Sequence, residues 1–428
     1  MTEPETTMRI GLICDRYDPG GGGAERNVVE VAEGLVARGH AVTILAGSGD
    51  APGVGRAYRV ERFAEGRTRS AGQLRRFRRW AERGFDAGRF DTSLSMVTTV
   101  PAAVIQPLGG TVAETQAQNA AAERRAIGRL ARGLGRAVNA KRRALRAAER
   151  ATMADGRVRL FAALSGYVVE QLERHYGVEP GRVRLIPNAV STPIPDEAER
   201  VERRAAMRSE LGVGEADVAY LFSAYNPRLK GAFPLLRAWG KVRAAGVAGA
   251  LVMTGRTPGR LKRRAAALGL GDSVRWVGPT DRMLDHYCAA DVLVHPTFYD
   301  PASRVVIEAL RLGTPAITTR FNGAADFMYA RGGAPRGRIV ARPEDADALA
   351  GAMIELADPG ARRACGEAMA EIEAEFDFDR HVDQLESALR SAAWSASPPT
   401  APAQAEDADA ASAPASAAGP SGGRESSG

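Results

Sequence analysis

The sequence predicts an α/β protein made of two doubly wound domains with parallel strands. The chain has 428 residues, which is enough for two hydrophobic cores of ordinary size. Near the N-terminus, the apolar run Arg9–Cys14, a glycine-rich turn and an amphipathic segment follow one another as strand, turn and helix. In the second half, short apolar runs repeatedly end in glycine, a cation or an acid. Because parallel strands share their carboxyl edge, these residues are expected to gather at a ligand-binding edge.

The first domain is predicted over residues 1–188. After the strand at 9–14, Gly22 and Gly23 close a glycine-rich turn and can let backbone amides approach a phosphate, although such turns often have no ligand. The segment 53–89 is basic and is predicted to be irregular. The other elements predicted here are helices at 24–38 and 166–176 and strands at 41–45, 91–97, 158–164 and 183–190.

A basic segment at 114–154 is predicted to be helical, because apolar residues recur in it at steps of three and four. Ten Lys and Arg residues surround these apolar positions. Two interpretations stay open: a helix that docks on an anionic membrane surface through Arg124, Arg125, Arg129 and Arg132, or a solvated face packed on its own domain. Nucleic acid is not expected as a partner, because the segment has no aromatic side chains for stacking.

The second domain is predicted over residues 189–376, followed by a helix at 377–394 and a disordered tail at 395–428. The tail is rich in Ala, Ser, Pro and Gly and has few apolar anchors. A strand at 218–224 leads into a cationic loop that holds Arg228 and Lys230. Further strands are predicted at 250–253, 274–277, 292–294, 316–319 and 338–340, and helices at 196–211, from 232, at 281–290 and from 303.

Composition and charge narrow the classes of function. The net charge is +7, and the tail holds four acids against one Arg, so the folded part carries +10 and suits anionic partners. Three cysteines and five scattered histidines show no disulfide or metal-ligand spacing, which predicts no metal site and a reducing, cytoplasmic compartment. The first seven residues lack the features of a signal peptide, and no apolar run reaches the ~20 residues of a spanning helix.

The candidate site lies between a buried strand at 292–294 and a helix that begins near Ser303. His295 follows the strand, Asp300 lies in the loop, and Glu308 lies in the second turn of the helix, where a half-exposed carboxylate is expected. The carboxyl edge of the sheet and the helix N-terminus favour a polar or anionic ligand there. Two acids at this spacing are weak evidence by themselves, because solvated acids on loops and helices are common.

This layout resembles the signature of retaining GT-B glycosyltransferases of family 4, in which seven residues separate two acids. The His-Pro pair at 295–296, the Gly-Thr-Pro run at 313–315 and the Gly-Gly-Ala-Glu-Arg opening at 22–26 strengthen the resemblance. It spans roughly residues 9–394, is strongest over 219–325, and is similar in particular to the lipopolysaccharide core glucosyltransferases. Asp300 departs from the pattern, because the family usually has Glu there.

The resemblance implies two Rossmann-like domains that face a central cleft. It also implies transfer of a hexose from a nucleoside-diphosphate sugar, with UDP favoured, to a lipid-linked or cell-envelope glycan at the inner membrane face, without a cofactor. Arg228 and Lys230 would neutralise the diphosphate, Glu308 would bind the ribose, and Asp300 would hold the sugar together with backbone amides. The donor-binding residues so implied are Gly22, Gly23, Gly255, Arg256, Gly278, Thr280, His295, Ala302, Ser303 and Arg304.

Two alternatives remain open at this point. A non-hydrolysing sugar-nucleotide epimerase uses the same fold, but it needs extra acids and a histidine in the first domain, where His40 is the only histidine before His175. A catalytically weak sugar-nucleotide-binding protein is the second alternative. Asp300 in place of Glu, and the lack of an evident acceptor-activating base in the first domain, both favour it.

Overall fold

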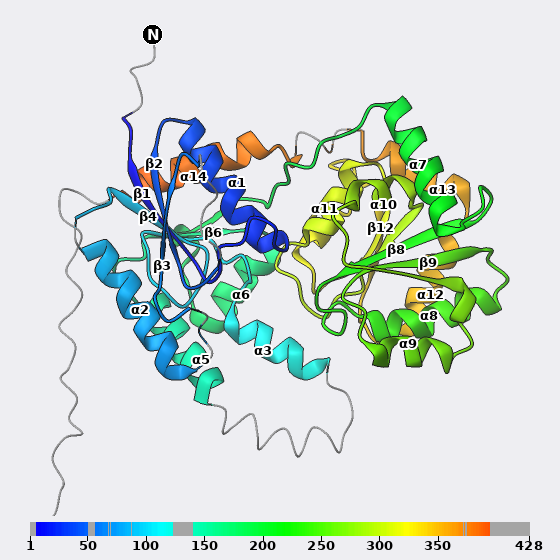
Figure 1. Ribbon diagram of the computed structural model, residues 1–428, viewed down its shortest axis with the longest axis horizontal. Helices are drawn as coiled ribbons and strands as arrows, with labels where there is room; N and C mark the ends of the chain where they lie inside the picture. The colour runs from blue at the N-terminus through cyan, green and yellow to red at the C-terminus, as the bar shows by residue number, and fades with distance from the viewer. Residues whose placement is uncertain are drawn as a thin grey trace, which may run out of the picture.

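The computed structural model describes residues 6–49, 56–66, 68, 70–86, 88–122, 140–370, 372 and 375–393. Within these residues the chain forms two α/β lobes, each built around one parallel sheet (Figure 1). This confirms the predicted fold class of two doubly wound domains. The predicted tail at 395–428 and the arginines Arg124, Arg125, Arg129 and Arg132 lie outside the described residues.

The sheet of the first domain has the strand order β3-β2-β1-β4-β5-β6-β7, with all neighbours parallel. Its strands are β1 Arg9–Cys14, β2 Ala41–Ala46, β3 Arg59–Arg62, β4 Thr92–Ser95, β5 Val104–Ile105, β6 Leu160–Ala163 and β7 Val183–Leu185. Its helices are α1 Gly23–Ala37, α2 Ala71–Asp86, α3 Val112–Ala121, α5 Ala140–Met153 and α6 Gly166–Tyr176 with the short η1 Pro180–Arg182. The chain order reverses between β1 and β4, so the loops after these two strands meet at a switch point where ligands bind.

The prediction that residues 53–89 are irregular is wrong, because this segment contains β3 and α2. Leu74, Phe77, Ala81 and Phe85 recur on one face of α2 and are buried in the first domain. Many arginines cover the other face of the helix and mask this apolar stripe in the sequence. Charged residues therefore dominate the composition of the segment, although one face of its helix belongs to the core.

The sheet of the second domain has the strand order β10-β9-β8-β11-β12-β13 and is also parallel. Its strands are β8 Val218–Ala224, β9 Gly249–Gly255, β10 Val274–Gly278, β11 Val292–Val294, β12 Ala316–Thr319 and β13 Gly337–Val340. Its helices are α7 Glu197–Leu211, α8 Ala232–Ala244, α9 Gly259–Ala266, η2 Gly271–Ser273, α10 Met283–Ala289, α11 Arg304–Arg311, η3 Gly323–Phe327, α12 Ala346–Glu355 and α13 Pro359–Glu367. Since β8 and β11 are neighbours, the cationic loop after β8 and the loop after β11, which holds Asp300, leave the sheet side by side.

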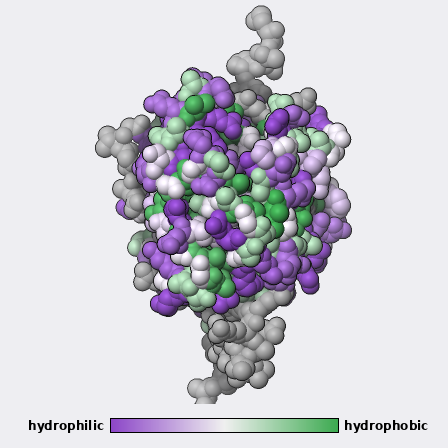
Figure 2. Space-filling model, turned by 90° about the vertical axis from the view of Figure 1, so that its right-hand side faces the viewer, coloured by the Kyte–Doolittle hydropathy of each residue, from purple (hydrophilic) through white to green (hydrophobic). Residues whose placement is uncertain are grey.

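The core of the second domain is formed by apolar side chains from both faces of its sheet, with Trp239 and Tyr220 among the largest fully buried ones. Its outer surface mixes hydrophilic residues, which are in the majority, with scattered apolar ones (Figure 2). Single exposed apolar residues such as Val201 on α7 and Ile354 on α12 are normal for a protein surface.

The last described helix, α14 Phe378–Ser391, packs on the first domain beside α1 (Figure 1). Val382, Leu385 and Leu389 belong to the hydrophobic core of that domain. Buried His381 donates from Nδ1 to the carbonyl oxygen of Pro187 at 2.7 Å, where the chain first crosses between the domains. Burial lowers the pKa of His381 to about 4, so the ring is neutral at pH 7. The two crossing segments are thus tied to each other.

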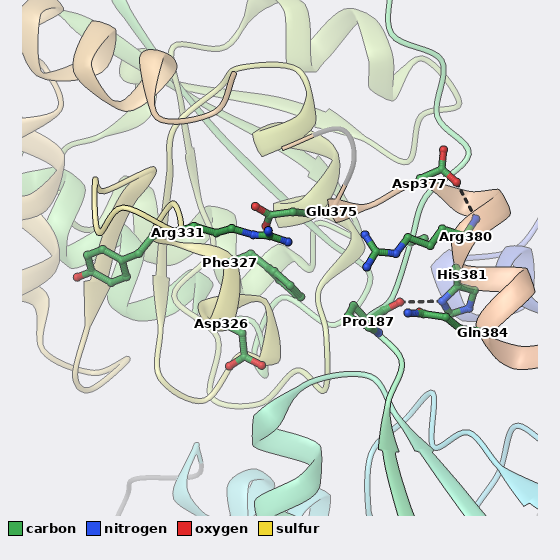
Figure 3. Close-up of a pocket in the computed structure, with 11 residues that line it drawn as sticks. Pro187, Asp326, Phe327, Arg331, Glu375, Asp377, Arg380, His381 and Gln384 are labelled. Atoms are coloured by element: carbon green, nitrogen blue, oxygen red, sulfur yellow. Dashed lines mark hydrogen bonds between the residues drawn. The ribbon is translucent and has the colours of Figure 1, made fainter. Parts of the chain in front are cut away.

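A pocket of about 390 Å³ lies between these crossing segments (Figure 3). Figure 3 shows Arg380, His381 and Gln384 from α14 on one side and Phe327 and Arg331 from the second domain on the other. Charges of both signs line the pocket, since Arg331 and Arg380 are cations and Asp326, Glu375 and Asp377 are acids.

None of the helices in the described part of the chain is both long and apolar enough to cross a bilayer.

Candidate functional site

Lys230 and Asp300 form an ion pair at the centre of the second sheet's carboxyl edge. Nζ of Lys230 donates to Oδ2 of Asp300 at 2.6 Å and to the carbonyl oxygen of Tyr299 at 2.9 Å. The strand order explains the contact, because Lys230 follows β8 and Asp300 follows the neighbouring β11. An ammonium group has three donors, and these bonds use two of them. The third can bind a phosphate oxygen of a ligand.

Gly231 lets the cationic loop approach the loop after β11. Its φ of 82° lies in the left-handed region, and a Cβ atom there would lie 2.0 Å from the carbonyl oxygen of Pro296. Only glycine therefore fits this position without moving one of the loops. Helix α8 begins directly after Gly231, which directs the helix N-terminus toward the same edge of the sheet.

Electrostatics keep Asp300 ionised. Burial by itself would raise the pKa of Asp300, but the Lys230 ammonium holds it well below its usual range. His295 is 2% exposed, its Nε2 lies 3.7 Å from Oδ2 of Asp300, and its ring stacks on Phe222. Burial lowers the pKa of His295, so the ring is neutral. Neither ring nitrogen has a hydrogen-bond partner among the described residues, which leaves a polar group available to a ligand.

Glu308 on α11 is buried, so the expectation of a half-exposed carboxylate is wrong. Its side chain is 3% exposed; Oε2 accepts from the Tyr287 hydroxyl at 2.6 Å and Oε1 accepts from the Thr192 hydroxyl at 3.1 Å. Tyr287 comes from α10 and Thr192 from the segment that links the domains. Each carboxylate oxygen has a second lone pair, so ribose binding by Glu308 stays a prediction.

Arg304 joins the two domains. Its guanidinium donates to both carboxylate oxygens of Glu30 on α1, at 2.7 and 3.1 Å, and is 8% exposed. Gly23 lies directly against this side chain, since a Cβ atom there would lie 3.0 Å from Cδ of Arg304. Glu30 also accepts from the Ser191 hydroxyl at 2.6 Å. The structure thus brings together Gly23 and Arg304, two residues predicted to face the donor.

Glu30 was not among the site residues predicted from the sequence. One signal was Asn27, a polar residue that lies one turn earlier on α1 and is followed by Val28 and Val29. Asn27 is buried and donates to Oδ1 of Asn188, and Asn188 in turn donates to the carbonyl oxygen of Ala302. Polar residues on the inner face of α1 therefore mark the contact with the second domain.

The amides of Ala302 and Ser303 already have partners within the second domain. The Ala302 amide donates to Oδ1 of Asp300 at 3.2 Å, and the Ser303 amide donates to Oδ1 of Asn322 at 3.2 Å. These bonds fix the loop before α11 rather than leave two free donors. The predicted contact of these amides with a sugar stays a prediction.

The remaining predicted residues lie along the same edge. Gly255 ends β9 with a φ of 85°, and a Cβ atom there would lie 2.3 Å from the Ala224 carbonyl oxygen. The Arg256 guanidinium lies 5.5 Å from the ring centre of Tyr225, which is exposed and was not predicted. The other positions are Gly278 at the end of β10, Thr280 beyond it, half-buried Arg228 in the loop after β8, and half-buried Gly23 with its neighbour Gly22 at the start of α1.

A cavity of about 410 Å³ opens in the first domain at the carboxyl edge of its sheet. One part of its wall is apolar and includes Leu74, Phe77 and Met96. Another part carries the cations Lys141 and Arg142. Asp15, Thr68, Val97, Thr98, Thr99, Gly109, Gly110, Val112, Thr115, Gln116, Asn119 and Leu145 complete the lining. We call it the first-domain cavity.

Among the described residues, no group of three or more His, Cys, Asp or Glu side chains is arranged to hold a metal ion. The three cysteines are buried and unpaired with one another. The charged groups of the site are therefore cations and single carboxylates of the chain itself.

Two family profiles match the chain. Residues 21–193 match Glycosyltransferase Family 4, and residues 216–358 match Glycosyl transferases group 1. A D-inositol 3-phosphate glycosyltransferase from Geodermatophilus obscurus is 32% identical over 240 residues, which cover 52% of this chain and 50% of that protein. A second such enzyme, from Catenulispora acidiphila, is 34% identical over 36% of this chain and 38% of its own length. The chain thus spans half or less of the length of these relatives.

Solved structures share the fold. WaaG, a glycosyltransferase involved in lipopolysaccharide biosynthesis, superposes with a TM-score of 0.72 at 21% identity, over 89% of this chain and 99% of WaaG. HepE from Anabaena, solved with UDP and glucose, superposes with a TM-score of 0.65 at 16% identity, over 90% of this chain and all of HepE. The two family matches show that the chain belongs to the glycosyltransferases, with a family 4 domain in its first half and a group 1 domain in its second, and the solved structures show that it has the GT-B fold.

Proposed function

We propose that the protein transfers a hexose, with retention of configuration, from a UDP-sugar to a hydroxyl group of a cell-envelope or lipid-linked glycan. The observation that carries the proposal is the pair Lys230 and Asp300 beside buried His295, at the start of α11 and opposite Gly23 of the first domain. A cation for the diphosphate and an acid for the sugar hydroxyls are thereby held within one loop cluster. A nucleotide sugar needs both.

The chemistry follows from where charge develops. When the bond between the sugar and the diphosphate breaks, negative charge grows on the leaving phosphate oxygen. The third N–H of Lys230, the half-buried Arg228 and the N-terminus of α8 would stabilise that charge without a metal ion. Ionised Asp300 and neutral His295 would accept or donate hydrogen bonds at the sugar hydroxyls and fix its position.

The acceptor would enter from the first-domain cavity, whose apolar wall and two cations suit a ligand with an apolar part and an anionic part. A phosphorylated polyol is the second candidate acceptor. The names of the relatives favour it, because both act on D-inositol 3-phosphate according to their names. Docking of the basic segment on anionic lipid remains a proposal that depends on Arg124, Arg125, Arg129 and Arg132.

The test is turnover with radiolabelled UDP-glucose and, in parallel, UDP-N-acetylglucosamine and UDP-galactose. Each donor is offered with lipopolysaccharide core oligosaccharide or with D-inositol 3-phosphate, and proton NMR of the product reads the anomeric configuration. A product with the donor's configuration supports retention. Donor binding without turnover on either acceptor would instead favour a sugar-nucleotide-binding protein, and an inverted product would contradict the proposal.

Replacing Asp300 by Glu should leave turnover equal to or above that of the natural chain. The reason is that Glu is the residue the family usually has here, and the Lys230 ammonium can still pair with it. Asp300→Asn is the matched control: it keeps the size, loses the charge, and should lose most activity. Initial rates at saturating donor decide the matter. A collapse of turnover in Asp300→Glu would mean that this site requires the shorter acid.

A further inference from the structure

We propose that Tyr299 is a positioning residue that fixes the donor site of the second domain against the first-domain cavity. This inference rests on the proposed function, since it assigns the two sites to donor and acceptor. Tyr299 immediately precedes Asp300 in the loop after β11, and its side chain is buried against the first domain. Its backbone and its side chain therefore belong to different sites.

The side chain of Tyr299 is held by the first domain. Its hydroxyl donates to Oε1 of Gln171 at 3.0 Å and lies 3.2 Å from the carbonyl oxygen of Gly109. Its ring meets the ring of Tyr167 edge to face, with centroids 6.0 Å apart. The same Oε1 of Gln171 accepts from the amide and the hydroxyl of Thr111, which caps the N-terminus of α3. The Tyr299 side chain thus contacts both Gln171 on α6 and Gly109 in the turn before α3.

The backbone of Tyr299 belongs to the donor site. Its carbonyl oxygen accepts from Lys230, and its amide donates to the hydroxyl of Thr297 at 3.1 Å. The amide of Phe298 donates to the carbonyl oxygen of Leu229 at 2.8 Å, which ties this loop to the cationic loop. A displacement of the phenol would therefore be transmitted through one residue to the ammonium of Lys230.

The turn at residues 109–110, which the Tyr299 hydroxyl contacts, lines the first-domain cavity. Gly109 and Gly110 both belong to that lining. Gly110 has a φ of 65°, and a Cβ atom there would lie 1.6 Å from the Tyr299 hydroxyl oxygen. The absence of a side chain at Gly110 is thus what lets the phenol reach Gln171. Since Tyr299 contacts both the lining of the cavity and Lys230, it helps to fix their relative position, beside the Arg304–Glu30 pair.

Hydrogen exchange of the full chain, without any ligand, tests whether Tyr299 holds the loop after β11 against the first domain. Tyr299→Phe should speed exchange by about tenfold in two segments, 109–115 of the first domain and 229–231 of the second, because the contact that joins them is lost. Tyr167→Phe is the matched control. It removes a buried phenol that donates to Glu114 at 2.8 Å within the first domain, so exchange at 229–231 should not change.

A second arm adds UDP as the probe. In the natural chain, saturating UDP should slow exchange at 109–115 as well as in the second domain, whereas in Tyr299→Phe only the second domain should respond. Calorimetry should give Tyr299→Phe a weaker affinity for UDP than the natural chain, since the loop that carries Lys230 opens more often, while Tyr167→Phe should keep the natural affinity. If UDP binds neither protein, the proposed donor is wrong, and the ligand-free arm still decides the docking.

A double-mutant cycle with Gly110→Ala completes the test. In the natural background Gly110→Ala should speed exchange at 229–231 by about tenfold, because its methyl group displaces the phenol. In the Tyr299→Phe background the same change should have a clearly smaller effect there, since the clashing oxygen is gone. Additive effects of the two changes, or unchanged exchange at 229–231 in Tyr299→Phe, would overturn the proposal.

Discussion

Replacing Lys230 by alanine should reduce turnover by about 10²–10³-fold and destabilise the second domain by roughly 3 kcal/mol. The first effect follows from losing the cation that faces the leaving phosphate. The second follows from leaving Asp300 ionised, largely buried and without its counter-ion, since the Asp300 side chain is 14% exposed. Turnover of UDP-glucose and urea denaturation followed by circular dichroism measure the two effects separately.

Two control variants separate the effect of losing any lysine from the effect of leaving Asp300 unpaired, and stability from turnover. Lys241→Ala removes a lysine from an ion pair with Asp347 in which both side chains are at least half exposed, so it should change neither quantity by much. The double variant Lys230→Ala with Asp300→Ala removes both charges and should regain most of the lost stability while it stays inactive. Full stability in Lys230→Ala alone would show that the pair is not held tightly. Retained turnover would remove Lys230 from the site.

Which parts of the fold could be predicted depended on how visible the apolar pattern was. The strands at 9–14, 218–224, 292–294 and 316–319 were predicted at the residues where the structure has them, because each is a short run rich in apolar or β-branched residues with a clear end. Helix α2 was missed because arginines surround its buried face. Charge density hides an apolar stripe from composition, although it does not weaken the packing of that stripe.

The site was predictable as a set of residues but not as a set of contacts. Lys230 and Asp300 were singled out separately, yet their pairing follows from the adjacency of β8 and β11, which no local pattern contains. Glu30 was missed for the same reason, since its partner Arg304 lies 274 residues away in the chain. Contacts between the domains depend on how the domains meet. That information is spread over many residues, Asn27, Asn188 and Tyr299 among them.

The burial of Glu308 is the clearest case in which the structure changes an expectation. A half-exposed carboxylate could be replaced by an amide without cost to the fold, whereas each oxygen of buried Glu308 accepts one hydrogen bond from a hydroxyl group. In Glu308→Gln, one oxygen becomes an NH₂ group that cannot accept, so either Tyr287 or Thr192 loses its acceptor. We therefore expect a loss of stability of about 1–3 kcal/mol together with the loss of activity.

The size of the activity loss in Glu308→Gln should exceed what the loss of stability explains, if the carboxylate also binds the ribose. Turnover of UDP-glucose and calorimetric binding of UDP, both measured well below the unfolding temperature, should fall by at least about tenfold, since a hydrogen bond to a charged group is worth about 1.5–3 kcal/mol. Tyr287→Phe is the matched control, because it removes one partner of Glu308 and keeps the carboxylate. It should destabilise the protein by a similar amount while UDP affinity changes much less. Equal losses of UDP affinity in both variants, or no loss in Glu308→Gln, would show that Glu308 holds the domains in place and does not bind the donor.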